Sequence, residues 1–108
     1  MTDKIVVLVT CSSPEEGRRI ARALVERRLA ACVNMVAGIE SVYRWKGAVE
    51  EASECLLLVK TTRGRFQALQ SAVRELHSYE LPEIVAVPIV DGLDAYLSWI
   101  AASVESVE

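Results

Sequence analysis

Cys11 and His77 are the residues of this chain whose chemistry best suits a metal ion. A thiolate and an imidazole are both good ligands for copper and zinc, and the carboxylate of Glu80 or Glu83, just after the histidine, could add an oxygen ligand. A stable site needs about three or four ligands. One chain therefore offers an incomplete set, and a subunit interface would have to bring further groups together.

Each of these residues also has a plain structural interpretation. A lone histidine beside Tyr79 is commonly a hydrogen-bonded structural group, and a single cysteine at a strand end is commonly a small core residue. A Cys/His or His/Glu pair would be the only starting point for catalysis, because the sequence has no Gly-rich phosphate loop, Cys-x-x-Cys pair or nucleophile elbow. We therefore expect a protein that is not an enzyme.

Two aromatic pairs are candidates for recognition surfaces, namely Tyr43 with Trp45 and Tyr96 with Trp99. Aromatic residues at such spacing usually pack, and the edges of long strands are generally covered by another subunit. We therefore expect the first pair to serve assembly rather than ligand binding. The apolar fraction of 52% also favours apolar surface at a subunit interface.

The charge of the chain argues against a generic nucleic-acid binder, because the formal net charge is -3. Several arginines crowd into residues 18–28, but interspersed glutamates favour a solvated helix face over a phosphate-binding stripe. Three cysteines without a signal peptide favour a reducing compartment, and no apolar run reaches the length of a membrane span. We expect a cytoplasmic protein with neither nucleic-acid nor membrane partners.

The first half of the chain predicts a strand, a helix and a long hairpin. An apolar run over 4–11 is typical of a buried strand. The segment from Ser13 to Glu16 predicts a helix start with a capping box. Gly38 predicts a bend or bulge within a long strand over 31–45, and a turn at Lys46-Gly47 leads into a strand over 49–62.

The second half predicts two helices around one strand. From Arg63 the apolar period is helical, and Leu81-Pro82 ends that helix. Pro88 puts the strand over 84–90 at an edge or a bulge, and Asp91-Gly92 predicts the cap of a last amphipathic helix. The order β-α-β-β-α-β plus a terminal helix predicts an α+β, ferredoxin-like antiparallel sheet with both main helices on one face. We expect residues 1–108 to form a single domain.

Five segments spread over nearly the whole chain resemble the CutA divalent-cation-tolerance family: LAACVN at 29–34, SVYRWKG at 41–47, LVKTT at 58–62, HSYELPEI at 77–84 and YLSW at 96–99. The resemblance implies a cytoplasmic ferredoxin-like subunit that forms a homotrimer through its hairpin strands, similar in build to the PII signalling proteins. It also implies an association with tolerance to divalent cations, notably copper. The family's copper-ligand candidates fall on Cys11 and His77. Leu76 stands where some members have a second histidine, and Ser78 replaces the usual proline.

Other functions fit the same architecture. Clefts between subunits of a PII-like trimer could hold a small anionic effector near Lys60, Arg63 and Arg65, or the trimer could be a structural scaffold. An RNA-recognition domain would need stacking aromatics on the central strands, and a metallochaperone would need a second cysteine in the first loop. The candidate site residues are thus Cys11 and His77 for copper or another divalent cation, and, around them, Glu80, Glu83, Lys60, Tyr43, Trp45, Tyr79 and Trp99.

Overall fold

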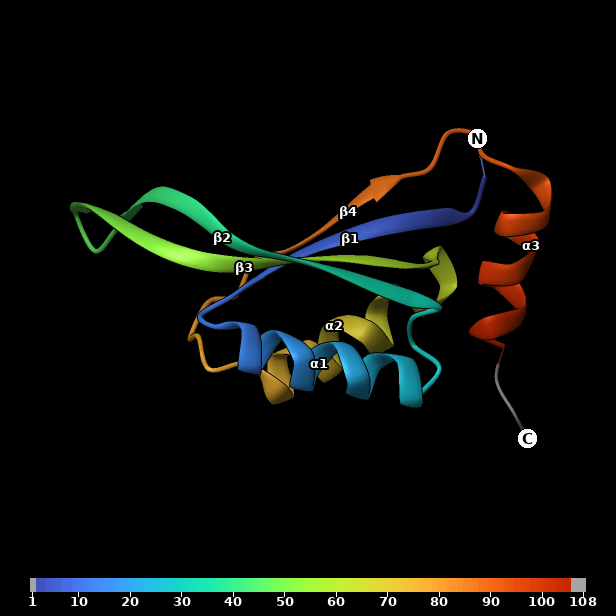
Figure 1. Ribbon diagram of the computed structural model, residues 1–108, viewed down its shortest axis with the longest axis horizontal. Coiled ribbons are helices and arrows are strands. Elements are labelled where there is room, and N and C mark those ends of the chain that lie inside the picture. The colour runs from blue at the N-terminus through green and yellow to red at the C-terminus, as the bar shows by residue number, and fades with distance from the viewer. Residues whose placement is uncertain (1, 106–108) are drawn as a thin grey trace.

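The computed structural model describes residues 2–105 and folds them into a four-stranded antiparallel sheet, with its two longer helices on one face and a third helix at one end (Figure 1). The elements are β1 (Lys4–Cys11), α1 (Pro14–Glu26), β2 (Cys32–Trp45), β3 (Ala48–Thr62), a 3-10 turn (Arg63–Arg65), α2 (Phe66–Leu76), β4 (Ile84–Pro88) and α3 (Asp94–Ser103). The strand order is β2-β3-β1-β4, and each neighbouring pair is antiparallel. The predicted ferredoxin-like arrangement with an added C-terminal helix is confirmed.

The core lies between the sheet and the helices α1 and α2. Residues 5, 7, 9 and 11 of β1 face residues 61, 59, 57 and 55 of β3 across the ladder, and all of them are buried. Ile20 and Leu24 of α1 and Leu69 and Val73 of α2 cover them from the helix side. Their spacing of four residues keeps each pair on one helical face.

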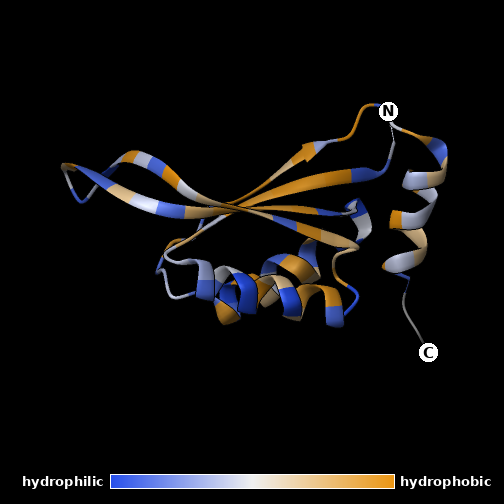
Figure 2. Ribbon diagram, in the orientation of Figure 1, coloured by the Kyte–Doolittle hydropathy of each residue, from blue (hydrophilic) through white to orange (hydrophobic). Residues whose placement is uncertain are grey.

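The other face of the sheet is apolar and is left open by the described part of the chain (Figures 1 and 2). We call it the open sheet face. Its apolar side chains come from all four strands and stay partly or largely exposed: Val6, Leu8, Val36, Leu56, Leu58, Val85 and Val87. Contiguous apolar surface of this kind marks an interaction site in a water-soluble fold.

Beyond the body of the protein, β2 and β3 continue as a hairpin arm, residues 39–54 (Figure 1). The arm starts at a bulge, where the register shifts between Val36 and Ile39 and Gly38 has φ of 73°. It closes with Lys46 and Gly47, whose positive φ values of 51° and 83° are typical of a type I′ turn. The predicted bulge and turn are therefore confirmed.

Several predicted boundaries differ from the structure. β4 is an edge strand, as Pro88 indicates, and it ends at that proline, although the N–H of Ile89 still donates to the carbonyl of Lys4 at 2.9 Å. α3 begins at Asp94 with Leu93 as its N-cap, while the Asp91 carboxylate accepts from the N–H of Gly92 at 2.9 Å. The helix predicted from residue 63 begins with a 3-10 turn, and it ends at Leu76 rather than at Leu81-Pro82, because His77 already has an extended backbone.

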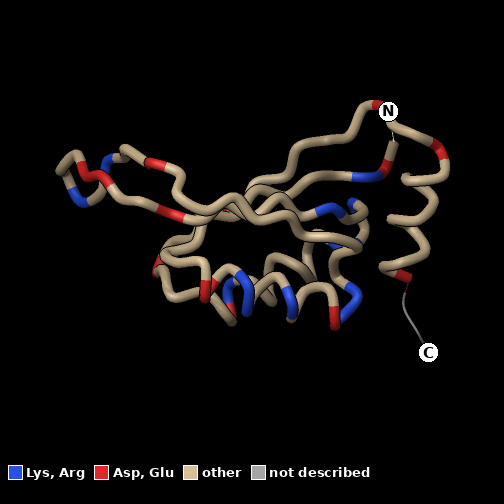
Figure 3. The backbone as a smooth tube through the Cα atoms, viewed as in Figure 1, with Lys and Arg blue, Asp and Glu red and all other residues tan. Residues whose placement is uncertain are grey.

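The arginines of α1 alternate with acidic residues on the outer surface (Figure 3). Arg22 pairs with Glu26 at 3.4 Å, and Arg27 pairs with Glu75 of α2 at 3.2 Å. These ion pairs fit a solvated helix face. No helix among residues 2–105 is long and apolar enough to span a bilayer.

Candidate metal centre and the adjacent cleft

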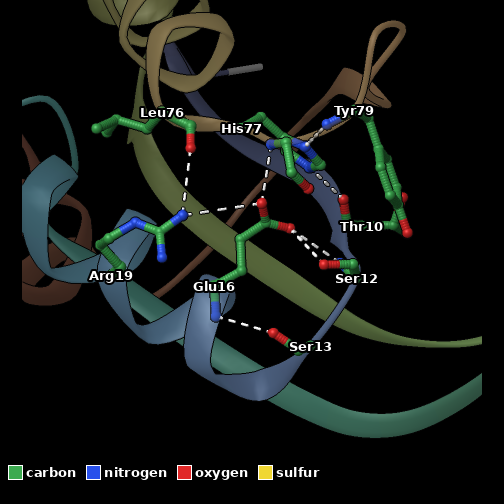
Figure 4. Close-up of polar contacts among 9 residues, drawn as sticks. Thr10, Ser12, Ser13, Glu16, Arg19, Leu76, His77 and Tyr79 are labelled. Carbon is green, nitrogen blue, oxygen red and sulfur yellow. Dashed lines mark hydrogen bonds and ion pairs between the residues drawn. The ribbon is translucent and has the colours of Figure 1, made fainter.

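Glu16, in the first turn of α1, forms hydrogen bonds to the loop before α1 and to the loop after α2. Ser13 caps the helix, since its hydroxyl accepts from the N–H of Glu16 at 3.1 Å. The Glu16 carboxylate does not return to Ser13 as a capping box requires. Instead Oε1 accepts from the N–H and the hydroxyl of Ser12, each at 3.0 Å, and Oε2 accepts from the N–H of Ser78 at 2.8 Å (Figure 4). Only half of the predicted capping box therefore forms.

The Glu16 carboxylate is 4% exposed and remains ionised at neutral pH. Its burial raises the pKa, but hydrogen bonds from Ser78 and Ser12 outweigh that desolvation and lower the pKa to about 2. Arg19 adds positive charge, with Nη2 3.9 Å from Oε2 of Glu16 and 3.4 Å from the carbonyl of Leu76 (Figure 4). The result is a buried anion held between α1 and the segment after α2.

His77 follows α2 directly and uses both ring nitrogens. Nδ1 accepts from the N–H of Tyr79 at 3.0 Å, and Nε2 lies 2.7 Å from the carbonyl of Thr10. These partners assign the proton to Nε2 and make the imidazole neutral. β4 begins at Ile84, opposite Val9, and does not reach Thr10. The imidazole therefore occupies the position of a strand partner at this edge.

Cys11, Glu16 and His77 form the candidate metal centre. One sulfur, one carboxylate oxygen and one imidazole nitrogen all lie within 4.8 Å of one another. Cys11 is fully buried, and burial together with the charge of Glu16 raises the pKa of its thiol to about 12. The structure thus brings Cys11 and His77 together, and the carboxylate beside them belongs to Glu16, which the sequence suggested only as a helix cap.

A cleft of about 710 Å³ lies between the hairpin arm and the loop after α2. All four of its charged lining residues are glutamates: Glu50, Glu54, Glu80 and Glu83. Tyr43, Trp45 and Tyr79 supply its aromatic surface. Five residues proposed from the sequence therefore line this cleft: Tyr43, Trp45, Tyr79, Glu80 and Glu83. The negative charge of its glutamates favours a bound cation over an anion.

Tyr79 connects the metal centre to the cleft. Its ring lies 4.7 Å from that of His77, centroid to centroid, and its hydroxyl donates to Oε2 of Glu54 at 2.7 Å. Burial, followed by the hydrogen bond and charge of Glu54, raises the pKa of Tyr79. Glu54 was not among the residues predicted from the sequence, where its only signal is an acidic side chain directly before the apolar run from Cys55.

The remaining candidates lie elsewhere. Lys60 pairs with the side chain of Asn34 on the open sheet face. Arg65, near the end of β3, donates from Nε to the carbonyl of Val104 at 2.7 Å. Trp99 stacks on Tyr96 in α3 with ring centroids 5.4 Å apart, and both rings are partly exposed. None of these side chains lines the acidic cleft.

Residues 5–103 match the profile of the CutA1 divalent ion tolerance protein family. The chain belongs to this family. It is 57% identical over 95 residues to the divalent-cation tolerance protein CutA of Thermus thermophilus, covering 88% of this chain and 92% of that protein. The solved structure of the divalent cation tolerance protein Cut A1 from Thermus thermophilus superposes with a TM-score of 0.93 at 53% identity, covering 94% of this chain and 99% of the other.

Some CutA relatives are much longer. The chloroplastic protein CutA of Arabidopsis thaliana is 46% identical over 99 residues, which cover 92% of this chain and 54% of that protein. The chain thus spans about half the length of this relative, whose name also assigns it to the chloroplast. The family resemblance carried by the five sequence segments is confirmed.

Proposed function

We propose that this protein is a divalent cation tolerance protein that binds or responds to a divalent metal such as copper. The observation that carries the proposal is the grouping of a thiol, a carboxylate and an imidazole within 4.8 Å at the candidate metal centre. Copper and zinc accept all three ligand types. The family's name supports the same chemistry.

Metal binding at this centre changes the loop that follows α2. Both nitrogens of His77 already serve backbone groups, so an ion that binds Nδ1 displaces the N–H of Tyr79. Tyr79 and the residues after it line the cleft, and its hydroxyl bonds Glu54 there. An ion at Cys11 and His77 would therefore alter the cleft, which gives the protein a way to respond to metal as well as to hold it.

The acidic cleft could bind a divalent cation in addition to the one at the candidate metal centre. Glu80 and Glu83 offer carboxylate oxygens suited to divalent ions. The main alternative is a PII-like module that binds a small anionic effector, and the negative lining of this cleft disfavours an anion there. A structural scaffold remains the other alternative, and it predicts no ligand at all.

The functional unit we propose is a homotrimer. The open sheet face and the hairpin arm support self-assembly, because Val42 and Val49 on the arm are 69% and 64% exposed in the single chain. β4 also has an unpaired edge that another strand can cover. Three copies agree with the trimeric build that the family resemblance implies.

We further propose binding without catalysis, in the cytoplasm, with neither nucleic acid nor membrane as a partner. The neutral, doubly hydrogen-bonded His77 and the raised pKa of Cys11 leave no activated base or nucleophile at the centre. Three free cysteines suit a reducing compartment. The net charge of -3 supports the absence of nucleic-acid binding.

Calorimetry with Zn²⁺, a redox-inert probe, and then with Cu²⁺ tests this function. The wild type should bind each ion, and Cys11→Ala should weaken binding while the far-UV circular dichroism stays unchanged. Cys32→Ser is the matched control, because Cys32 lies outside the centre. Unchanged stoichiometry and affinity in Cys11→Ala would contradict the proposed centre.

A thermal-shift screen on the same sample compares metals with nucleotides, since a ligand that binds the native state raises the melting temperature. Stabilisation by nucleotides alone would favour the effector module. No response to either class would favour the scaffold.

A further inference from the structure

Cys11 has a second thiol directly opposite it in the sheet. Cys55 is its partner in the β1–β3 register, and the two side chains, both on the helix-covered face, are 0% and 1% exposed. Cys55 packs under α1, where a Cβ added at Gly17 would lie 3.2 Å from its sulfur. Two free thiols therefore lie beneath the first turns of α1, and that of Cys11 lies next to Glu16 and His77.

These two thiols are potential metal ligands that no hydrogen bond within the described part of the chain occupies. Both nitrogens of His77 and both oxygens of Glu16 already accept or donate hydrogen bonds. Among the residues that the structure describes, the thiol groups of Cys11 and Cys55 make no hydrogen bond. An ion that used only the two sulfurs would leave the surrounding network intact.

The register of β1 and β3 places the two thiols within reach of one ion. Directly opposite residues of an antiparallel pair hold their Cβ atoms about 4.5–5.5 Å apart, and Cys11 and Cys55 are such a pair. Two metal–thiolate bonds of about 2.3 Å in line separate the sulfur atoms by about 4.6 Å. Cysteine side chains that extend from opposed positions on the same face of the sheet can adopt that separation.

We propose that Cys11 and Cys55 form a two-thiolate site for Cu(I). The inference rests on the proposed metal-binding function and assigns to it a soft, monovalent ion, because thiolate ligands select Cu(I). Two thiols and one Cu(I) give a Cys–S–Cu–S–Cys unit of charge -1 and release two protons. The positive charges of Arg18 and Arg19 act on Cys55 and Cys11 respectively and partly offset that negative charge.

An anaerobic titration of the full-length protein with Cu(I), in competition with a chromogenic Cu(I) chelator, tests the site. The wild type should bind one Cu(I) per chain. Cys55→Val keeps an apolar residue of strand-forming type at this position, and it should lower Cu(I) affinity by more than about 100-fold, beyond the 10–100-fold typical of changes beside a site. Cys32→Ser, the remaining cysteine, should bind as the wild type does.

Equal Cu(I) affinity in Cys55→Val and the wild type would overturn the proposal, as would no Cu(I) binding by the wild type. X-ray absorption at the copper edge of the wild type gives a test that needs no variant. Two sulfur neighbours support the site, and fewer than two contradict it. Failure of the Zn²⁺ and Cu²⁺ titrations alone would reject the divalent function without changing these Cu(I) readouts.

Discussion

The buried carboxylate of Glu16 should contribute about 3 kcal/mol to the stability of the protein at neutral pH. Its pKa falls from an ordinary 4.5 to about 2 on folding, and that difference corresponds to about 3 kcal/mol by linkage. Glu16→Gln keeps the shape of the side chain but removes the charge and turns one acceptor into a donor that faces Ser12 or Ser78. The free energy of unfolding of this variant should therefore be about 3 kcal/mol lower than that of the wild type at neutral pH.

The pH dependence gives the sign of the effect. A carboxyl whose folded pKa is lowered stabilises the protein above its unfolded pKa, near 4.5, and the contribution is lost as the pH falls toward 2. About 2 kcal/mol of it should disappear between pH 7 and pH 3. The difference in the free energy of unfolding between the wild type and Glu16→Gln should therefore decrease by about 2 kcal/mol over this pH range. Arg19, Cys11 and His77 are the other titratable groups that face this carboxylate.

Urea unfolding of metal-free protein, at one fixed protein concentration, measures both quantities. Glu15→Gln is the matched control, because Glu15 occupies the same helical turn but is exposed. It should change the free energy of unfolding by less than about 0.5 kcal/mol. Equal effects of the two substitutions at pH 7, or a gap that does not depend on pH, would refute the reasoning.

Three further predictions concern the cleft, the bulge and the arm. Tyr79→Phe should cost about 1–3 kcal/mol in urea unfolding, because it leaves the largely buried Glu54 without its donor; a neutral result would mean that this bond is not formed. Gly38→Ala should cost about 1 kcal/mol through its positive φ, whereas Gly64→Ala should not, since neither site has atoms within 4 Å of an added Cβ. Val42→Glu should reduce the trimer fraction in sedimentation velocity, because the arm is proposed to bury this residue between subunits; an unchanged trimer would exclude that contact.

Local patterns predicted the fold well. Apolar runs located the strands, helical periodicity located the apolar face of α2, and Gly38 and Lys46-Gly47 marked the bulge and the turn. These features depend on a few neighbouring residues, so the sequence carries them directly. The start of α3 was predicted wrongly because Leu93, an exposed apolar residue, is its N-cap instead of the polar Asp91.

The site was only partly predictable, because its contacts join distant segments. Cys11 and His77 were chosen for their chemistry, but their approach depends on an imidazole that replaces a strand partner of Thr10. Glu16 carried a local signal as a helix cap, while its bond to Ser78 spans 62 residues. The pairing of Cys11 with Cys55 required the register of two strands, which composition and periodicity do not fix.

Native mass spectrometry of the purified protein, before and after addition of Zn²⁺, tests most directly whether the protein is a metal-binding trimer. We expect a species of three times 11.9 kDa that gains one ion per chain. A species of 11.9 kDa that takes up no ion would contradict it.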